Sequence, residues 1–231
     1  MKKTNLFSAL SLLVLIPATL FLGTHLRGRW HYLTSTLVIL EAMLPFFLTF
    51  EARKPQAREL VTIAVMAALA VAGRVAIPVP NFKAVTGIVM ITGIAFGPQA
   101  GFMTGAISAF ASNFFYAQGP WTPWQMLAYG MGGFLAGVFF RRRNPNPRLD
   151  ALLQTVFGFV AVMVMVGPLL DACTIFTTGA RISWKFATAV LVAGLPHNVT
   201  HAASCAATIF LLGKPLLTKL DRLKTKYGML R

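Results

Sequence analysis

The chain has 231 residues, of which 56% are hydrophobic and only 12% are charged, and its mean hydropathy is +0.68. Because a soluble domain carries about a quarter charged residues, this composition excludes water as the main solvent. The formal net charge of +15 does not indicate a nucleic-acid partner, since the cations lie in short segments between apolar runs. The composition predicts an all-α, polytopic transmembrane helical bundle in contact with the lipid bilayer.

Apolar runs close to membrane-spanning length recur along the chain. They predict helices at 6–24, 33–50, 60–77, 84–97, 99–117, 124–140, 151–176 and 186–213. The first run lacks a small-residue cleavage site and contains Pro17, which favours a retained helix over a signal peptide. The fourth and fifth runs are separated only by Phe96-Gly97-Pro98, so we expect a tight helical hairpin there.

The lysines and arginines are distributed unequally between alternate connections. If all eight predicted helices cross the membrane, 15 of the 21 cations fall on the side of the two termini, in residues 2–3, 53–58, 141–148 and 214–231. Because cytoplasmic connections collect Lys and Arg, both termini are expected in the cytoplasm. The basic tail 214–231 has leucines at helical spacing, which fits either a short helix on an anionic leaflet or a solvated extension.

Small residues recur at four-residue spacing on three of the predicted helices, where they allow close approach of helix backbones in lipid. The rows on 99–117 and 124–140 predict packing inside the bundle and consist of Gly101, Gly105, Ala109, Gly133 and Gly137. The row on 60–77 consists of Ala64, Ala68 and Ala72. Because Ala67 and Ala70 continue this row around the helix, we expect a second smooth face to be left for a partner subunit.

The densest polar cluster within an apolar run lies on the last predicted helix. His197 and His201 are four residues apart and share one helix face, as two metal ligands on a helix do. Asn198 stands where a zinc protease has its glutamate, so contact with a ligand or polar packing is favoured over a metal site. Since the sequence has no G-x-x-x-x-G-K-[ST] motif, we expect no ATP hydrolysis by the chain itself.

The segment Gln118-Gly-Pro-Trp-Thr-Pro-Trp-Gln125 combines two tryptophans and two prolines without a charge. Prolines limit the conformations of a loop, so the segment is predicted to form a rigid aromatic lid that covers a binding site. Tryptophan is also common at the bilayer interface, so an interfacial anchor is the alternative interpretation.

Three stretches together resemble a known family: Ala64-x-x-x-Ala68, the hairpin sequence 87–105, and the Trp-Pro segment 118–125. They are similar to the substrate-binding S components of energy-coupling factor (ECF) transporters, which import vitamins into prokaryotic cells. The resemblance covers about residues 58–213, a six-helix core. It implies a substrate-binding core at 58–213 and leaves a two-helix membrane extension at 1–57, which departs from the six-helix pattern, and the basic cytoplasmic tail at 214–231.

The resemblance also implies function and partners. The chain would capture a vitamin outside the cell, without a cofactor of its own, and associate with a transmembrane coupling subunit and two ATPases. Ala64, Ala68 and Ala72 match the motif that meets the coupling subunit.

Within the family the chain looks most like the cobalamin-type subunits. A corrinoid would suit a wide outward cavity, for which the candidate binding residues are Asn113, Tyr116, Trp121, Trp124, Gln125, His197, Asn198 and His201. A smaller vitamin or a queuosine-type precursor stays open as an alternative substrate.

Two functions of other classes stay open as well. An intramembrane metal-dependent enzyme would require His197, His201 and Asp171 to converge on one site. A scaffold or assembly factor would use only the small-residue faces.

Overall fold

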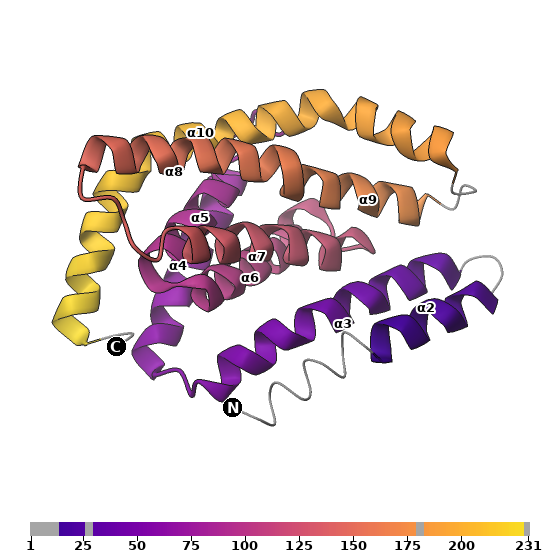
Figure 1. Ribbon diagram of the computed structural model, residues 1–231, viewed down its shortest axis with the longest axis horizontal. Helices are drawn as coiled ribbons and strands as arrows, with labels where there is room; N and C mark the ends of the chain where they lie inside the picture. The colour runs from indigo at the N-terminus through magenta and orange to yellow at the C-terminus, as the bar shows by residue number, and fades with distance from the viewer. Residues whose placement is uncertain (1–13, 26–29, 179–182, 229–231) are drawn as a thin grey trace.

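The computed structural model describes residues 14–25, 30–178 and 183–228, and within these ranges it contains helices and connections but no β-strand (Figure 1). The α-helices are α2 (Ile16–His25), α3 (Trp30–Ala52), α4 (Ala57–Val75), α5 (Val85–Phe96), α6 (Pro98–Tyr116), α7 (Trp121–Phe139), α8 (Pro147–Ala161), α9 (Gly167–Thr177) and α10 (Trp184–Tyr227). The predicted all-helical bundle is confirmed. The start of the first predicted helix, residues 6–13, lies outside the described residues.

Helix α5 forms the centre of the bundle. All 12 of its residues are buried, and its sequence carries no charged side chain. A helix that is apolar on every side must be covered on every side, and α5 packs against α4, α6, α7 and α10.

The predicted hairpin between the fourth and fifth helices is confirmed. Helix α5 ends at Phe96 and α6 begins at Pro98, so Gly97 is the whole connection. Gly97 has a φ of 91°, which a residue with a side chain adopts only with strain. Pro98 suits the first turn of α6 because a backbone N–H there needs no helical partner.

Helices α6 and α7 approach each other through their glycine rows. A Cβ atom on Gly101 would collide with the carbonyl oxygen of Gly133, and one on Gly105 would lie 2.5 Å from the backbone nitrogen of Gly130. The internal packing that the sequence predicts for these rows is therefore confirmed.

The N-terminal extension is attached to the core through α3. Phe46 stacks on Phe102 of α6 with ring centroids 4.2 Å apart, and it meets the ring of Phe134 of α7 edge-on at 5.1 Å. Ile39 and Met43 are buried in the same cluster. Helix α3 thus shares a hydrophobic cluster with the helices that follow it.

The segment predicted as one helix at 151–176 contains a local change of winding. Residues Val162–Val166 form a π-helical turn that joins α8 to α9, directly before Gly167 and Pro168. A proline removes one backbone donor from the helical ladder, and a π-turn is one way in which a helix accommodates such a disruption.

The last helix is longer than predicted. It was expected to end at 213 but continues to Tyr227, although Pro196 and Pro215 lie inside it. Proline kinks a helix without necessarily ending it, and Figure 1 shows the C-terminal part of α10 turned away from the first part. The predicted boundary between core and tail therefore falls within α10.

The C-terminal part of α10 is attached to the bundle. Leu217 and Leu220 are buried in the main core cluster. Arg143 Nη2 donates to both carboxylate oxygens of Asp221 at 2.6 Å. The tail is therefore not a solvated extension but a continuation of α10, and its contact with an anionic leaflet stays a prediction.

Among the described residues, three segments are long and apolar enough to span a membrane: Leu33–Ala52, Pro147–Thr177 and Trp184–Tyr227. Eight spans were expected from the sequence. The helices α4, α6 and α7 have 19 residues each but carry charged or polar side chains and glycines, which lower their mean hydropathy or break the apolar run.

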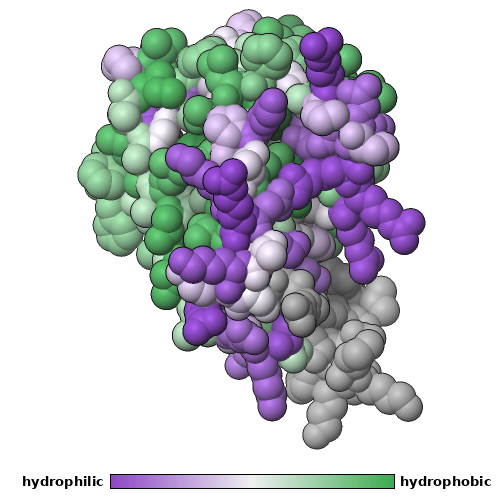
Figure 2. Space-filling view, turned by 90° about the vertical axis from the view of Figure 1, so that its left-hand side faces the viewer, coloured by the Kyte–Doolittle hydropathy of each residue, from purple (hydrophilic) through white to green (hydrophobic). Residues whose placement is uncertain are grey.

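Hydrophilic side chains gather at one end of the molecule, which lies at the left in Figure 1 and faces the viewer in Figure 2. The starts of α4 and α8 and the C-terminal part of α10 lie at this end. Exposed cations from these segments and their connections include Arg53, Lys54, Arg58, Arg141, Arg142, Arg143 and Arg148. We call this the basic end.

Candidate functional site

A polar pocket lies beside the N-terminal part of α7, whereas the basic end lies at the C-terminus of that helix. Its volume is about 480 Å³. We call it the arginine pocket, and its lining consists of Arg74, Pro78, Pro80, Asn81, Lys83, Tyr116, Gln125, Tyr129, Leu170 and His201. These residues come from five helices and from the connection between α4 and α5.

Arg74, in the last turn of α4, is the most heavily bonded side chain of the pocket and is only 9% exposed. Its Nη1 donates to Ser112 Oγ and, at 2.9 Å, to Asn113 Oδ1. Its Nη2 lies 3.4 Å from Gln125 Oε1. All three acceptors are neutral, so they fix the guanidinium group in place without neutralising its charge.

Two tyrosine rings flank the same guanidinium. Its carbon lies 5.0 Å from the ring centroid of Tyr116 and 5.6 Å from that of Tyr129. The Tyr116 hydroxyl donates to the carbonyl oxygen of Arg74 at 2.9 Å. Cation–π attraction to a ring face supports a guanidinium that is withdrawn from water.

A further layer of hydrogen bonds orients Asn113. Its Nδ2 donates to Thr122 Oγ1 at 3.0 Å, and Thr122 Oγ1 donates to Gln118 Oε1 at 2.8 Å. These bonds join the C-terminal end of α6 to the first turn of α7. The acceptor that faces Arg74 is thus held by a network, which favours a preformed pocket.

The connection between α4 and α5 brings a second cation to the pocket. Lys83 Nζ donates to the carbonyl oxygen of Ile77 and lies 5.8 Å from the ring centroid of Tyr116. The carbonyl oxygen of Lys83 accepts from Ser204 Oγ of α10 at 2.7 Å. This contact ties the connection to α10.

Half of the residues predicted for substrate binding meet at this place. Tyr116, Gln125 and His201 line the arginine pocket, and Asn113 supports Arg74 from behind. His201 is buried, and its Nε2 is hydrogen-bonded to Thr86 Oγ1 at 2.6 Å.

The two predicted tryptophans do not line the pocket. Helix α7 begins at Trp121, so the expected loop 118–125 is shorter than predicted, and Pro120 and Pro123 fit the N-terminus of a helix, where a backbone N–H needs no partner. Trp124 is 5% exposed and stacks on Phe176 of α9 at 5.8 Å. Trp121 is 40% exposed. The rigid aromatic lid expected at 118–125 is therefore absent from the described pocket.

His197 and Asn198 are not among the lining residues either, although His197 contacts one of them. His197 is exposed, and its Nδ1 accepts from Asn81 Nδ2 at 2.6 Å. Asn198 is buried and donates to Asp171 Oδ2 at 2.7 Å, which joins α9 to α10. Within the described ranges, no group of three or more His, Cys, Asp or Glu side chains is arranged to hold a metal ion.

Seven lining residues are missing from the predicted site, and four of them bring a charged or polar side chain: Arg74, Asn81, Lys83 and Tyr129. In the distribution of Lys and Arg along the sequence, Arg74 and Lys83 are considered only as cations near a connection. The available signal is that Arg74 falls inside the predicted helix 60–77, where a charged side chain is costly and marks a functional site by default. Nothing in the local sequence marks Asn81 or Tyr129.

The comparison with protein families decides the identity. The family model described as "ECF-type riboflavin transporter, S component" matches residues 54–222, which is most of the chain. The chain belongs to this family. No curated protein and no solved structure gave a significant match.

The S component predicted from the sequence is thus confirmed at the level of the family, whose members are membrane-embedded substrate-binding subunits of vitamin transporters and not enzymes. The match begins after α3 and ends within α10, so it includes α4 and the arginine pocket and leaves out the N-terminal extension.

The S component also presents a smooth apolar face on α4. Ala64, Ala68 and Ala72 are exposed, whereas Ala67 and Ala70 are buried. The row predicted for partner docking therefore lies on the surface of the molecule. Large aliphatic side chains flank it, namely Leu60, Val61, Val65 and Leu69, all of them exposed.

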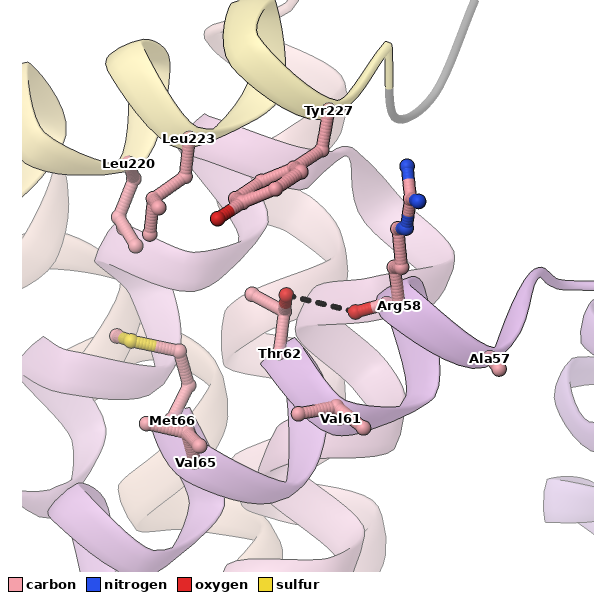
Figure 3. A pocket seen from close by; sticks show the side chains of 9 residues that line it. All are labelled: Ala57, Arg58, Val61, Thr62, Val65, Met66, Leu220, Leu223 and Tyr227. Atoms are coloured by element: carbon pink, nitrogen blue, oxygen red, sulfur yellow. Dashed lines mark hydrogen bonds between the residues drawn. The ribbon is translucent and has the colours of Figure 1, made fainter.

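A second hollow, of about 450 Å³, lies between the first half of α4 and the C-terminal part of α10 (Figure 3). We call it the apolar hollow, and it is lined by Ala57, Arg58, Val61, Thr62, Val65, Met66, Leu220, Leu223 and Tyr227. Figure 3 shows the leucines and the tyrosine of α10 extending toward α4. The Thr62 hydroxyl donates a hydrogen bond to the carbonyl oxygen of Arg58 at 2.8 Å, so it does not offer its proton to the hollow. Most of the other lining side chains are aliphatic.

Proposed function

We propose that this S component captures a vitamin in the arginine pocket at the outer face of a prokaryotic cell membrane and delivers it inward together with a coupling subunit and two ATPases. The convergence of fixed polar side chains on one pocket inside the family match carries the proposal. Its volume of about 480 Å³ falls within the roughly 300–1,000 Å³ of small-molecule sites.

The orientation follows from the charges. The basic end favours the cytoplasm, because Lys and Arg collect in cytoplasmic connections. The C-terminal part of α10 lies at this end (Figure 1), so the C-terminus is assigned to the cytoplasm. The N-terminus is assigned to the same side from the distribution of Lys and Arg along the sequence. The arginine pocket then opens toward the outside, where a vitamin is met first.

The substrate is best supported as a compact vitamin of the riboflavin type, which agrees with the family description. A corrinoid is far larger than a flavin, and most of its ring system would lie outside a pocket of this size. Cobalamin, which the resemblance suggested, and a queuosine-type precursor are therefore second choices.

The coupling subunit is assigned to the surface formed by Ala64, Ala68, Ala72 and the adjoining apolar hollow. Small side chains allow a partner helix to approach closely in lipid, and these three alanines are exposed in the described structure. The two ATPases supply the nucleotide chemistry for which the chain has no P-loop sequence.

Equilibrium binding to the purified full-length chain tests the proposed function. We expect one vitamin from a panel of riboflavin, cobalamin and other vitamins to bind with one-to-one stoichiometry and to be recovered unchanged. Binding by none of them would contradict the proposal. Metal-dependent conversion of a bound compound would instead favour the intramembrane enzyme.

A further inference from the structure

The arginine pocket carries an unbalanced positive charge. Arg74 and Lys83 both line it, and no Asp or Glu does. All six acidic side chains of the chain lie in described positions. Among the described residues the ion pairs join Arg53 to Glu59 and Arg143 to Asp221, so neither pocket cation has a carboxylate partner there.

Asp171, on the same helix as the lining residue Leu170, does not supply the missing charge. Its Oδ2 accepts from Asn198 Nδ2 at 2.7 Å, and it does not line the pocket. The remaining polar groups around Arg74 are hydroxyls, amides, tyrosine rings and the imidazole of His201. They can orient a guanidinium group but cannot neutralise it, and a buried charge without a counter-ion is costly.

The guanidinium also has donors to spare. Of its five N–H groups, the bonds to Ser112, Asn113 and Gln125 use three. In the described part of the chain, the Nε–H and one N–H of Nη2 have no acceptor. The side chain is only 9% exposed and faces the pocket, so a ligand in the pocket is positioned to accept from it.

We propose that the substrate of this S component carries an anionic oxygen group, a carboxylate or a phosphate, that binds against Arg74 with Lys83 as the second cation. Both groups match the forked geometry of a guanidinium and form charge-assisted hydrogen bonds with it. This inference rests on the proposed function, because it assigns a chemical class to the ligand of the same pocket.

Matched ligand pairs test the charge requirement on the unmodified full-length protein. The pairs are riboflavin 5′-phosphate with riboflavin, nicotinate with nicotinamide, and biotin with biotinamide. In the pair that binds, we expect the anionic member to bind at least about tenfold more tightly, with a preference that falls as the salt concentration rises. Equal or tighter binding of the neutral member would overturn the inference and leave the proposed function intact. Binding by none of these compounds and by no other vitamin of the wider panel would contradict the proposed function itself.

Variants of the two cations locate the contact. We expect Arg74→Gln to weaken binding of the anionic member about 100-fold and binding of the neutral member only a few-fold. Arg74→Lys should restore part of the lost affinity. Lys83→Gln should weaken binding of the anionic member about fivefold. Lys185→Gln, which removes an exposed cation that does not line the pocket, serves as the control and should change neither.

If Arg74 had a purely structural role, the result would differ, because its loss would weaken binding of both members of a pair equally. That outcome would overturn the inference. If Arg74→Gln fails to fold, Lys83→Gln and the salt dependence of the unmodified protein still decide it, since neither depends on removal of the buried guanidinium.

Discussion

The two hollows of this protein have nearly the same size, about 480 and 450 Å³, but opposite chemistry. Helix α4 contributes to both, with Arg74 in its last turn and Ala57 and Arg58 in its first. In the arginine pocket, polar side chains converge and are fixed by hydrogen bonds. In the apolar hollow, aliphatic side chains of α4 and α10 face each other without such a network. Volume therefore does not distinguish the pocket proposed for the vitamin from the surface proposed for docking, whereas fixed polar groups do.

Replacing the small alanines of α4 by larger residues should distinguish the two regions most clearly. The double substitution Ala64→Leu with Ala68→Leu should reduce vitamin uptake into whole cells to background, because larger side chains prevent close approach of a partner helix. Equilibrium binding by the purified variant should stay within about twofold of the original protein, since both positions are exposed and outside the pocket.

Ala203→Leu is the matched control, because Ala203 is an exposed alanine on α10 that lines neither hollow. It should leave both uptake and binding unchanged. Uptake that persists in the double variant would show that the docking surface lies elsewhere.

A smaller effect is expected from Asn113→Leu, which acts on the arginine pocket alone. The substitution removes an acceptor of Arg74 and a donor to Thr122. Leaving a buried donor unsatisfied costs about 1–3 kcal/mol, and more for a charged group, which corresponds to at least roughly 5–150-fold weaker binding when the loss falls on the bound state. Titration of the purified variant with the best-binding vitamin measures it.

Ser108→Ala provides the comparison on the same helix. Ser108 is buried, but its hydroxyl donates only to the carbonyl oxygen of Gly105 in its own helix. We expect the Ser108→Ala variant to bind the vitamin with an unchanged dissociation constant. If both variants lost affinity equally, the network around Asn113 would have no special part in holding the pocket.

The smallest effect is expected at the rim of the apolar hollow. Leu223→Ser removes a partly exposed aliphatic side chain from the lining. Burial of such a side chain against a partner is worth up to about 1.5–3 kcal/mol, and partial burial should leave a two- to fivefold reduction in uptake with normal binding. A change in vitamin affinity instead would contradict the separation between the two hollows.

Local sequence signals predict much of the fold. Gly97 followed by Pro98 gives the hairpin, because one residue must adopt a positive φ and the next must begin a helix. The glycines of α6 and α7 predict their own close packing. Prolines mislead in two places, since Pro120 and Pro215 can be accommodated at a helix start or a kink as well as in a loop.

The site is predicted only in part, because it is assembled from segments far apart in the chain. Helical spacing places His197 and His201 on one face, but the packing of α10 buries the second and exposes the first. The path of the connection that carries Asn81 and Lys83 depends on contacts with α10. No local pattern encodes such contacts, whereas the charge of Arg74 inside an apolar helix was visible in the sequence.

The structure of the full-length protein in lipid nanodiscs, saturated with its tightest-binding vitamin, tests the central claim most directly. The account predicts the vitamin in the arginine pocket, in contact with Arg74, Gln125 and Tyr129. A vitamin bound in the apolar hollow, or on the exposed faces of α8 and α9, would contradict it.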